Sequence, residues 1–110
     1  MSRNKAGLSR MPRHFDLRLF FRGVCLGGIR DPVGAFPWMD GSFTPSPAAA
    51  AFRDFFRWMV DEGNRGEDPP FDEALLDEAN WSVERADGSR VGISVPAVLE
   101  ESGSISWRWR

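Results

Sequence analysis

The sequence predicts an α+β fold: an antiparallel sheet of about five strands with one long and one short helix packed on one face, in the chain order β-β-α-α-β-β-β. Two observations support this prediction. Hydrophobic and polar residues alternate near both ends of the chain, over residues 14–22 and 105–110, as in strands with one buried face. Between them, the large hydrophobic residues of 52–60 recur at helical spacing.

The first strand is expected over residues 14–22. Four apolar residues at alternate positions would share its buried face: Phe15, Leu17, Leu19 and Phe21. Residues 23–37 are rich in glycine and proline and are expected to be mostly loop, with a short extended piece around 24–26. A loop of this length is often functional, so it is a candidate partner-binding loop; a hairpin with an irregular tip would explain the same composition.

A second strand is expected over residues 36–44. Phe36 and Trp38 have one parity and Phe43 has the other, so an unbroken strand would place their rings on opposite faces. A glycine bulge or a tight turn at Asp40-Gly41 would add the residue that brings all three rings to one side.

The long helix is expected to run from a Ser46 cap, through Pro47 and four alanines, to about Glu62, and to stop at Gly63. Its buried stripe is expected to contain Phe52, Phe55, Phe56, Met59 and Val60. Trp58 lies at the border of this stripe, where it either covers the edge of the core or stays partly exposed as an anchor for a partner.

A short helix is expected over residues 71–79, after a cap at Asp68. Its inward-facing residues would be Phe71, Leu75, Leu76 and Ala79. The stretch from 62 to 78 is acidic. It could attract a basic partner, although a solvated helical face explains the same composition.

The C-terminal third predicts a hairpin with a defined register. A two-residue loop at Asp87-Gly88 would place the apolar residues of its two strands on opposite faces. A three-residue loop over 86–88 instead pairs Val83 with Val91, and it requires Gly88 in the left-handed region. Trp81 would then pair with Ile93.

After the hairpin, Pro96 should end its strand because proline lacks a backbone donor. A last strand over residues 105–110 should then turn its larger apolar side chains inward. These are Ile105, Trp107 and Trp109.

The 110-residue chain has the size of one domain, expected over residues 14–110, and its 42% hydrophobic content is that of a globular protein. Residues 1–13 carry four basic and no acidic residues. They are expected to form a flexible basic arm, unless translation begins at Met11 and the first ten residues do not belong to the native protein.

Cysteine usage and hydropathy bear on location. The single cysteine, Cys25, cannot form an internal disulfide, and the early apolar run is too short and interrupted for a signal peptide or a membrane span. These features favour a cytoplasmic protein without a membrane partner.

Residue types that often act in catalysis are scarce, because the chain has one histidine, one cysteine and no tyrosine. We therefore predict no catalytic residues, no metal site and no cofactor, and a protein that is not an enzyme. The least implausible alternative is a small cysteine-dependent enzyme with Cys25 as nucleophile and His14 as base.

Two binding hypotheses remain. The leading one is a non-catalytic protein-interaction module, such as an accessory subunit, an inhibitor or a toxin-neutralising protein, which binds a protein partner or forms a homodimer through a free strand edge. The alternative is nucleic-acid binding through the C-terminal Trp-Arg-Trp-Arg sequence, joined by arginines of the first strand if the two strands are neighbours. The candidate interaction surface comprises Arg18, Arg22, Arg30, Trp58, Arg108 and Arg110.

Overall fold

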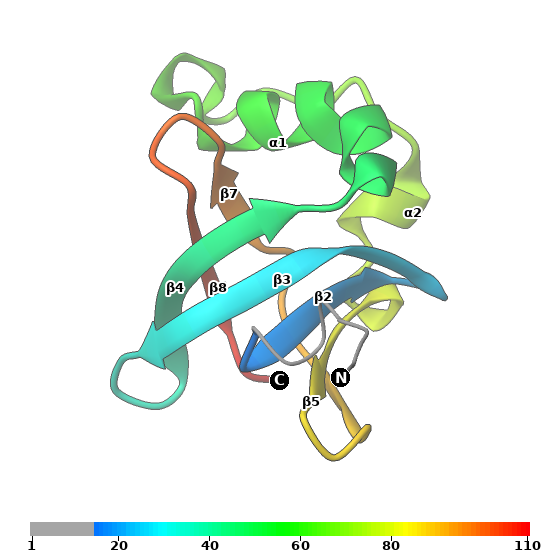
Figure 1. The fold of residues 1–110 in the computed structure, drawn as a ribbon. Coiled ribbons are helices and arrows are strands. Elements are labelled where there is room, and N and C mark those ends of the chain that lie inside the picture. Colours follow the sequence, from blue (N-terminus) through cyan, green and yellow to red (C-terminus); the bar gives the residue numbers. More distant parts are fainter. Residues whose placement is uncertain (1–14) are drawn as a thin grey trace.

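The computed structural model describes residues 15–110, which form one antiparallel sheet with a few helices, and this confirms the α+β class (Figure 1). The sheet has seven strands in the spatial order β6-β5-β2-β3-β4-β8-β7, where about five were predicted. The strands are β2 Leu17–Phe21, β3 Val24–Val33, β4 Trp38–Pro45, β5 Trp81–Arg85, β6 Arg90–Gly92, β7 Ala97–Leu99 and β8 Ser104–Arg108. The two unpredicted strands are β3 and β7. The predicted arm at residues 1–13 lies outside the described residues.

The sheet does not lie flat beneath the helices, because the chain after β6 meets the end of β8. An isolated bridge pairs Ile93 with Trp109, and the backbone N–H of Arg110 donates to the carbonyl of Gly92 at 3.2 Å. The chain that follows β6 therefore lies beside the end of β8 and closes the sheet into a barrel. The helices lie together at the opposite end, away from the β3–β4 and β5–β6 turns (Figure 1).

The ten-residue strand β3 replaces most of the predicted loop. Gly27 and Gly28 were interpreted as breakers, but both lie inside the strand, where other groups pass close to their backbone. A Cβ atom on Gly27 would overlap the backbone oxygen of Thr44, and one on Gly28 would overlap the ring of Phe15. Glycine is needed here for close approach rather than for a turn. Phe15 consequently packs over Gly28 on the outer face and does not join the buried face of β2, as had been expected.

The predicted bulge in β4 is wrong. β4 pairs with β8 without interruption from Trp38 to Ser42, so Trp38 faces outward and Phe43 faces the core. The irregularity lies in the neighbouring strand, where the register shifts between Arg30 and Val33 opposite Gly41. The parity difference between the aromatic rings therefore reflects two faces of one regular strand.

The long helical segment has the predicted stripe but a different start. Residues Pro47–Phe52 form a 3-10 helix and α1 covers Arg53–Val60, so the α-helix ends before Glu62. Ser46 does not cap the segment. Its hydroxyl donates to the carbonyl of Cys25 at 2.8 Å and its N–H donates to the carbonyl of Leu26 at 2.8 Å, which ties the start of the segment to β3.

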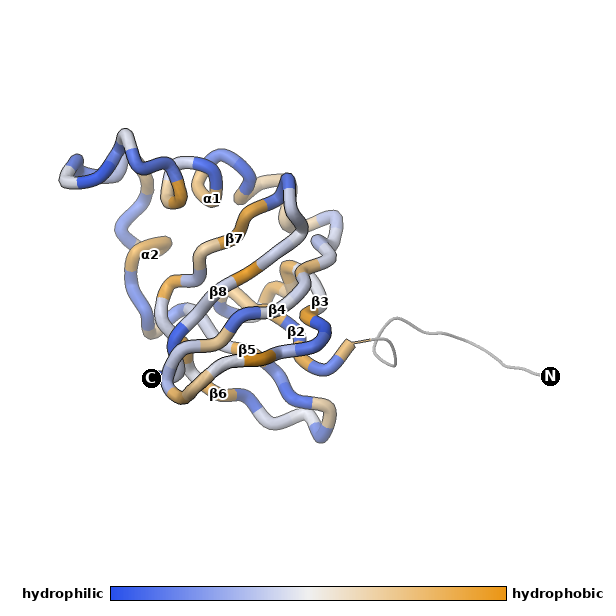
Figure 2. The backbone as a smooth tube through the Cα atoms, turned by 90° about the vertical axis from the view of Figure 1, so that its left-hand side faces the viewer, coloured by the Kyte–Doolittle hydropathy of each residue, from blue (hydrophilic) through white to orange (hydrophobic). Residues whose placement is uncertain are grey.

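The second helix is shorter than predicted. α2 covers only Glu73–Leu76, and Asp72 caps it by accepting from the N–H of Ala74 at 2.9 Å; Asp68 is not the cap. Single 3-10 turns lie on either side, at Glu62–Asn64 and Glu78–Asn80. Ala79 is exposed rather than inward-facing. The connection from α1 to α2 is hydrophilic and largely exposed (Figure 2).

The core lies between the concave face of the sheet and the helices. Phe55 and Phe56 from α1 are about 1% exposed and meet the fully buried Trp81 of β5. The buried cluster consists of Leu17, Leu19, Leu26, Ile29, Phe43, Ala49, Phe55, Phe56, Trp81, Val83, Ile93, Val98, Ile105 and Trp107. The predicted inward faces of β2, β5 and β8 are thus confirmed for most of their residues.

The predicted hairpin register is confirmed. Val83 pairs with Val91, Gly88 has φ of +89°, and the N–H of Ile93 donates to the carbonyl of Trp81 at 3.2 Å. The turn residue Asp87 accepts from the hydroxyl of Ser89 at 2.7 Å and from its backbone N–H at 2.9 Å.

These two bonds lower the pKa of Asp87, the hydroxyl bond having the larger effect. An NMR titration of the Asp87 carboxyl should give a midpoint below that of an ordinary aspartate, and Ser89→Ala should raise it. Because the pKa is lowered in the folded state, the small stabilisation by ionised Asp87 is present at neutral pH and is lost as pH falls through the folded-state pKa. Ser102→Ala, in the turn before β8, is the matched control, and an equal effect of both serine changes would contradict the assignment.

Candidate interaction surface

Exposed large hydrophobic side chains gather on the β3–β4 hairpin. Val33 is 62% exposed, Phe36 is 80% exposed and Trp38 is 62% exposed. We call these three residues the hairpin patch. Two other large hydrophobic side chains in residues 15–110 are strongly exposed: Val24 at the start of β3 and Leu99 at the end of β7. Such a concentration of apolar surface marks an interaction site more often than scattered single residues do.

The end of β8 and the residues after it hold the hairpin patch in place. The N–H of Trp109 donates to the carbonyl of Pro37 at 2.9 Å, which fastens the hairpin tip to the C-terminal segment. Trp38 pairs with Arg108 across β4 and β8, and the Arg108 guanidinium carbon lies 5.9 Å from the centre of the Trp38 ring. The patch is therefore an aromatic surface bordered by positive charge at the end of the barrel opposite the helices (Figure 1).

A pocket of about 270 Å³ opens beside the patch. It is lined by Phe36, Arg85, Val91, Trp109 and Arg110. We call it the tip pocket. Its walls come from the β3–β4 turn, the β5–β6 hairpin and the C-terminal segment, so only the closed barrel assembles it.

Arg110 is held firmly in the wall of the tip pocket. Its Nε donates to the carbonyl of Ile93 at 2.8 Å and its Nη2 donates to the carbonyl of Trp81 at 3.2 Å. The guanidinium lies across Gly92, where a Cβ atom would come within 2.6 Å of Cζ. Arg110 therefore contributes to closure of the barrel as well as to the charge of the pocket.

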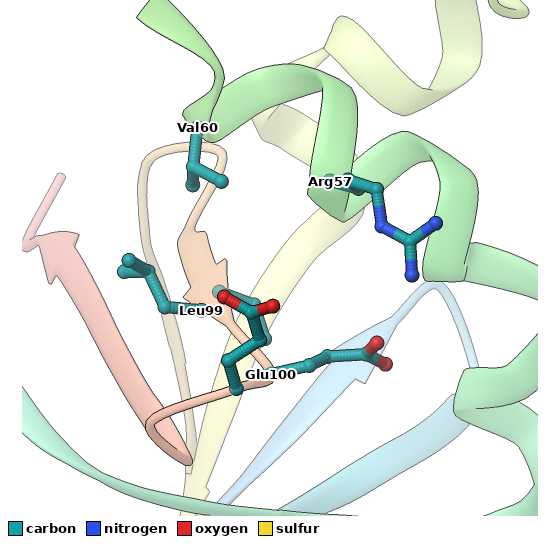
Figure 3. A pocket seen from close by; sticks show the side chains of 6 residues that line it. Arg57, Val60, Leu99 and Glu100 are labelled. Carbon is teal, nitrogen blue, oxygen red and sulfur yellow. The ribbon is translucent and has the colours of Figure 1, made fainter.

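A second hollow, of about 170 Å³, lies between α1 and the edge strand β7 (Figure 3). Arg57 and Val60 of α1 face Leu99 and Glu100 across it, and Glu100 forms an ion pair with Arg53 at 3.2 Å. β7 is only three residues long and packs beside α1, so it offers little edge for strand pairing. Homodimer formation through a strand edge stays a prediction.

The predicted basic residues do not form one surface. β3 and β4 separate β2 from β8, so the arginines of β2 and its turn are not neighbours of Arg108 and Arg110 in the sheet. Arg18 lies 3.4 Å from Glu84, which also pairs with Arg90 at 3.6 Å. This carboxylate offsets the charge of Arg18 on the outer face of the barrel.

The remaining candidates are dispersed. Arg22 lies in the turn between β2 and β3 with φ of +56°, and the guanidinium carbon of Arg30 lies 5.0 Å from the centre of the Phe15 ring. Trp58 is half-buried and meets Phe71 edge-on at 6.2 Å, so it covers part of the helical layer while keeping one side exposed. A binding role for any of these three residues stays a prediction.

Sequence reasoning missed Phe36, Trp38 and Arg85. The signal for Trp38 was present in its parity, which differs from that of Phe43, but a bulge was invoked to bury both rings. The sequence around Arg85 gave no sign of a site, because the pocket that Arg85 lines is completed by two distant segments of the chain.

The cysteine hypothesis gains no support from the surroundings of Cys25. The thiol is half-buried, and its sulfur lies 3.9 Å from the carbonyl oxygen of Gly27. His14 lies outside the described residues, so the pairing stays a prediction. Within residues 15–110 there is no group of three or more histidine, cysteine or acidic residues arranged to hold a metal ion. Over the same residues, no helix is long and apolar enough to cross a membrane.

Comparisons with known proteins found no match for the chain. No protein-family model matches it, and neither a curated protein nor a solved structure matches it.

Proposed function

We propose that the protein is a non-catalytic interaction module whose protein partner docks on the hairpin patch. The observation that carries this proposal is the exposure of Val33, Phe36 and Trp38 on a single hairpin. Aromatic residues and arginine are enriched at the centres of protein interfaces, and removing such rings from water supplies much of the binding free energy. An accessory subunit, an inhibitor and a toxin-neutralising protein would all use a surface of this kind.

The hydrogen bonding of the hairpin supports the proposal. β3 and β4 pair along most of their length, and the bond from Trp109 to Pro37 holds the tip. A surface that is already ordered loses little conformational entropy when it binds. We also propose that the protein acts in the cytoplasm, the location that its single cysteine favours.

Binding of single-stranded nucleic acid is the second candidate, because Arg108 lies against Trp38 and such a pair can stack on a base and neutralise a phosphate. Other features favour the protein partner. Arg18 is offset by Glu84, and the chain has a net charge of −2. A polyanion would need a wider basic face.

Site-specific photo-crosslinking tests the proposal. A benzophenone side chain at position 36 should give a discrete adduct with a protein in extracts of the native host, and Trp38→Ser should suppress that adduct by removing the neighbouring ring. Val24, which is 45% exposed at the β2–β3 turn, is the matched control position.

Equal adducts from positions 24 and 36, or none from either, would count against docking on the hairpin patch. If nuclease removes the adduct and protease treatment of the partner does not, the partner is a nucleic acid and the second candidate function is favoured. The purified protein alone serves as a further sample, in which an adduct identifies the partner as a second copy of the chain.

A further inference from the structure

We propose that the tip pocket binds an acidic side chain of the partner, held by Arg85 and Arg110 and packed against Phe36 and Trp109. This inference rests on the proposed function and adds the chemistry of the docking segment: a carboxylate beside an apolar group. The ligand class follows from the two kinds of wall that meet in the pocket.

The charged wall of the pocket carries two guanidinium groups and no acidic side chain. The nearby carboxylates are engaged elsewhere, since Glu84 pairs with Arg18 and Arg90, and Asp87 accepts both donors of Ser89. Among residues 15–110, no acidic side chain forms an ion pair with Arg85. No described acidic side chain lines the pocket, and the lowered pKa of Asp87, to which Arg85 contributes, is due mainly to Ser89.

Arg110 uses some of its guanidinium N–H donors within the protein and keeps others for a ligand. Nε and Nη2 bond to the carbonyls of Ile93 and Trp81, and these bonds fix the plane of the guanidinium. A guanidinium has five N–H donors, so this group keeps donors for a ligand after both bonds are made. Because its orientation is already set, little side-chain entropy is lost when a carboxylate binds.

The apolar wall makes the charge effective. Phe36, Val91 and Trp109 give the pocket an apolar side. A carboxylate that packs against these side chains loses part of its water, and a charge-assisted hydrogen bond is stronger where water is partly excluded. The same side chains offer contact to an apolar group next to the carboxylate. An aspartate or glutamate beside an aliphatic or aromatic residue satisfies both walls, whereas a hydrated phosphate leaves the apolar wall unused.

The positive charge is confined to two arginines, which favours a single carboxylate over a polyanion as the ligand. The two arginines lie in a chain of net charge −2, with Glu84 and Asp87 on neighbouring positions of the same hairpin. A nucleic acid strand would bring its next phosphates toward these acids. An isolated acidic side chain requires only the pocket itself.

The inference is tested with hydrocinnamate, which joins a phenyl ring to a carboxylate, and with its neutral amide as the matched ligand. The tryptophan indole N–H signals of the isotopically labelled protein report binding by NMR. Hydrocinnamate should shift the Trp109 signal saturably at millimolar concentration, and the amide should bind about tenfold more weakly because it lacks the ionic hydrogen bonds.

Arg85→Glu should abolish the shift, and Arg85→Gln should weaken binding about tenfold. Arg65→Glu is the charge-matched control, because Arg65 is exposed on the connection between α1 and α2, and it should leave binding unchanged. A far-ultraviolet circular dichroism spectrum like that of the wild type shows that each variant is folded.

Three results would overturn the inference. One is equal binding of the acid and the amide, and another is binding that is insensitive to both Arg85 variants. The third is an oligothymidine strand that shifts Trp109 more tightly than hydrocinnamate does, which would assign the pocket to nucleic acid. If hydrocinnamate fails while the adduct from position 36 still forms, the pocket inference falls and the proposed function stands.

Discussion

Replacing Trp81 with alanine is expected to lower the free energy of unfolding by about 3–5 kcal/mol, because the change leaves a large cavity at the centre of the core. Trp81 is 0% exposed, and the Phe21 ring lies 5.0 Å away edge-on while the Phe55 ring stacks on it at 6.2 Å. Its indole N–H donates to the carbonyl of Leu75 at 2.9 Å, so the change also leaves that carbonyl without this donor. A domain of this size has a free energy of unfolding of only about 5–15 kcal/mol, so the change would remove a substantial part of it.

Urea denaturation followed by circular dichroism measures this effect. Trp38→Ala is the matched control, since it removes the same side chain from a position that is 62% exposed, and it should change the free energy of unfolding by less than about 0.5 kcal/mol. Comparable losses in the two variants would contradict the placement of Trp38 outside the core. The pair thus separates a tryptophan that stabilises the fold from one proposed to bind a partner.

Gly27→Ala is expected to destabilise the protein by about 2–3 kcal/mol through steric overlap. The added Cβ would overlap the backbone oxygen of Thr44 and come within 2.7 Å of Cζ of the Phe43 ring. Neither neighbour moves freely, because Thr44 is paired in the sheet opposite Gly28 and Phe43 is packed in the core. Relief of the overlap would therefore separate β3 from β4.

Gly23→Ala tests whether the loss arises from crowding rather than from a general effect of replacing glycine. No atom lies within 4 Å of a Cβ built on Gly23, so this substitution should leave stability within about 0.5 kcal/mol of the wild type. Thermal unfolding of both variants gives the comparison. A similar change in melting temperature for the two would show that close packing at Gly27 is not the cause.

The two glycine variants also bear on the proposed site. The hairpin patch lies on β3 and β4, and the tip pocket requires Phe36 from the turn between them. A loosened β3–β4 pair should therefore weaken crosslinking from position 36 even where part of the protein remains folded. Gly23→Ala should leave the adduct unchanged.

The sequence predicted best those elements whose register depends on nearby residues. The hairpin around Gly88 follows from parity and loop length, and both are local properties. The inward stripe of α1 follows from helical periodicity in the same way. The candidate site was predicted less well, because Phe36 and Trp38 were expected inside the core.

What the amino-acid sequence determined by itself is the α+β class, the buried faces of β2, β5 and β8, and the turn between β5 and β6. Tertiary structure alone decided that Gly27 and Gly28 lie within a strand and that Arg85 and Arg110 meet at one pocket. The physical reason is the range of the interactions. Periodicity and turn geometry act over a few residues. The space beside a glycine and the residues that surround an arginine depend instead on strands that are distant in sequence and come together only when the barrel closes.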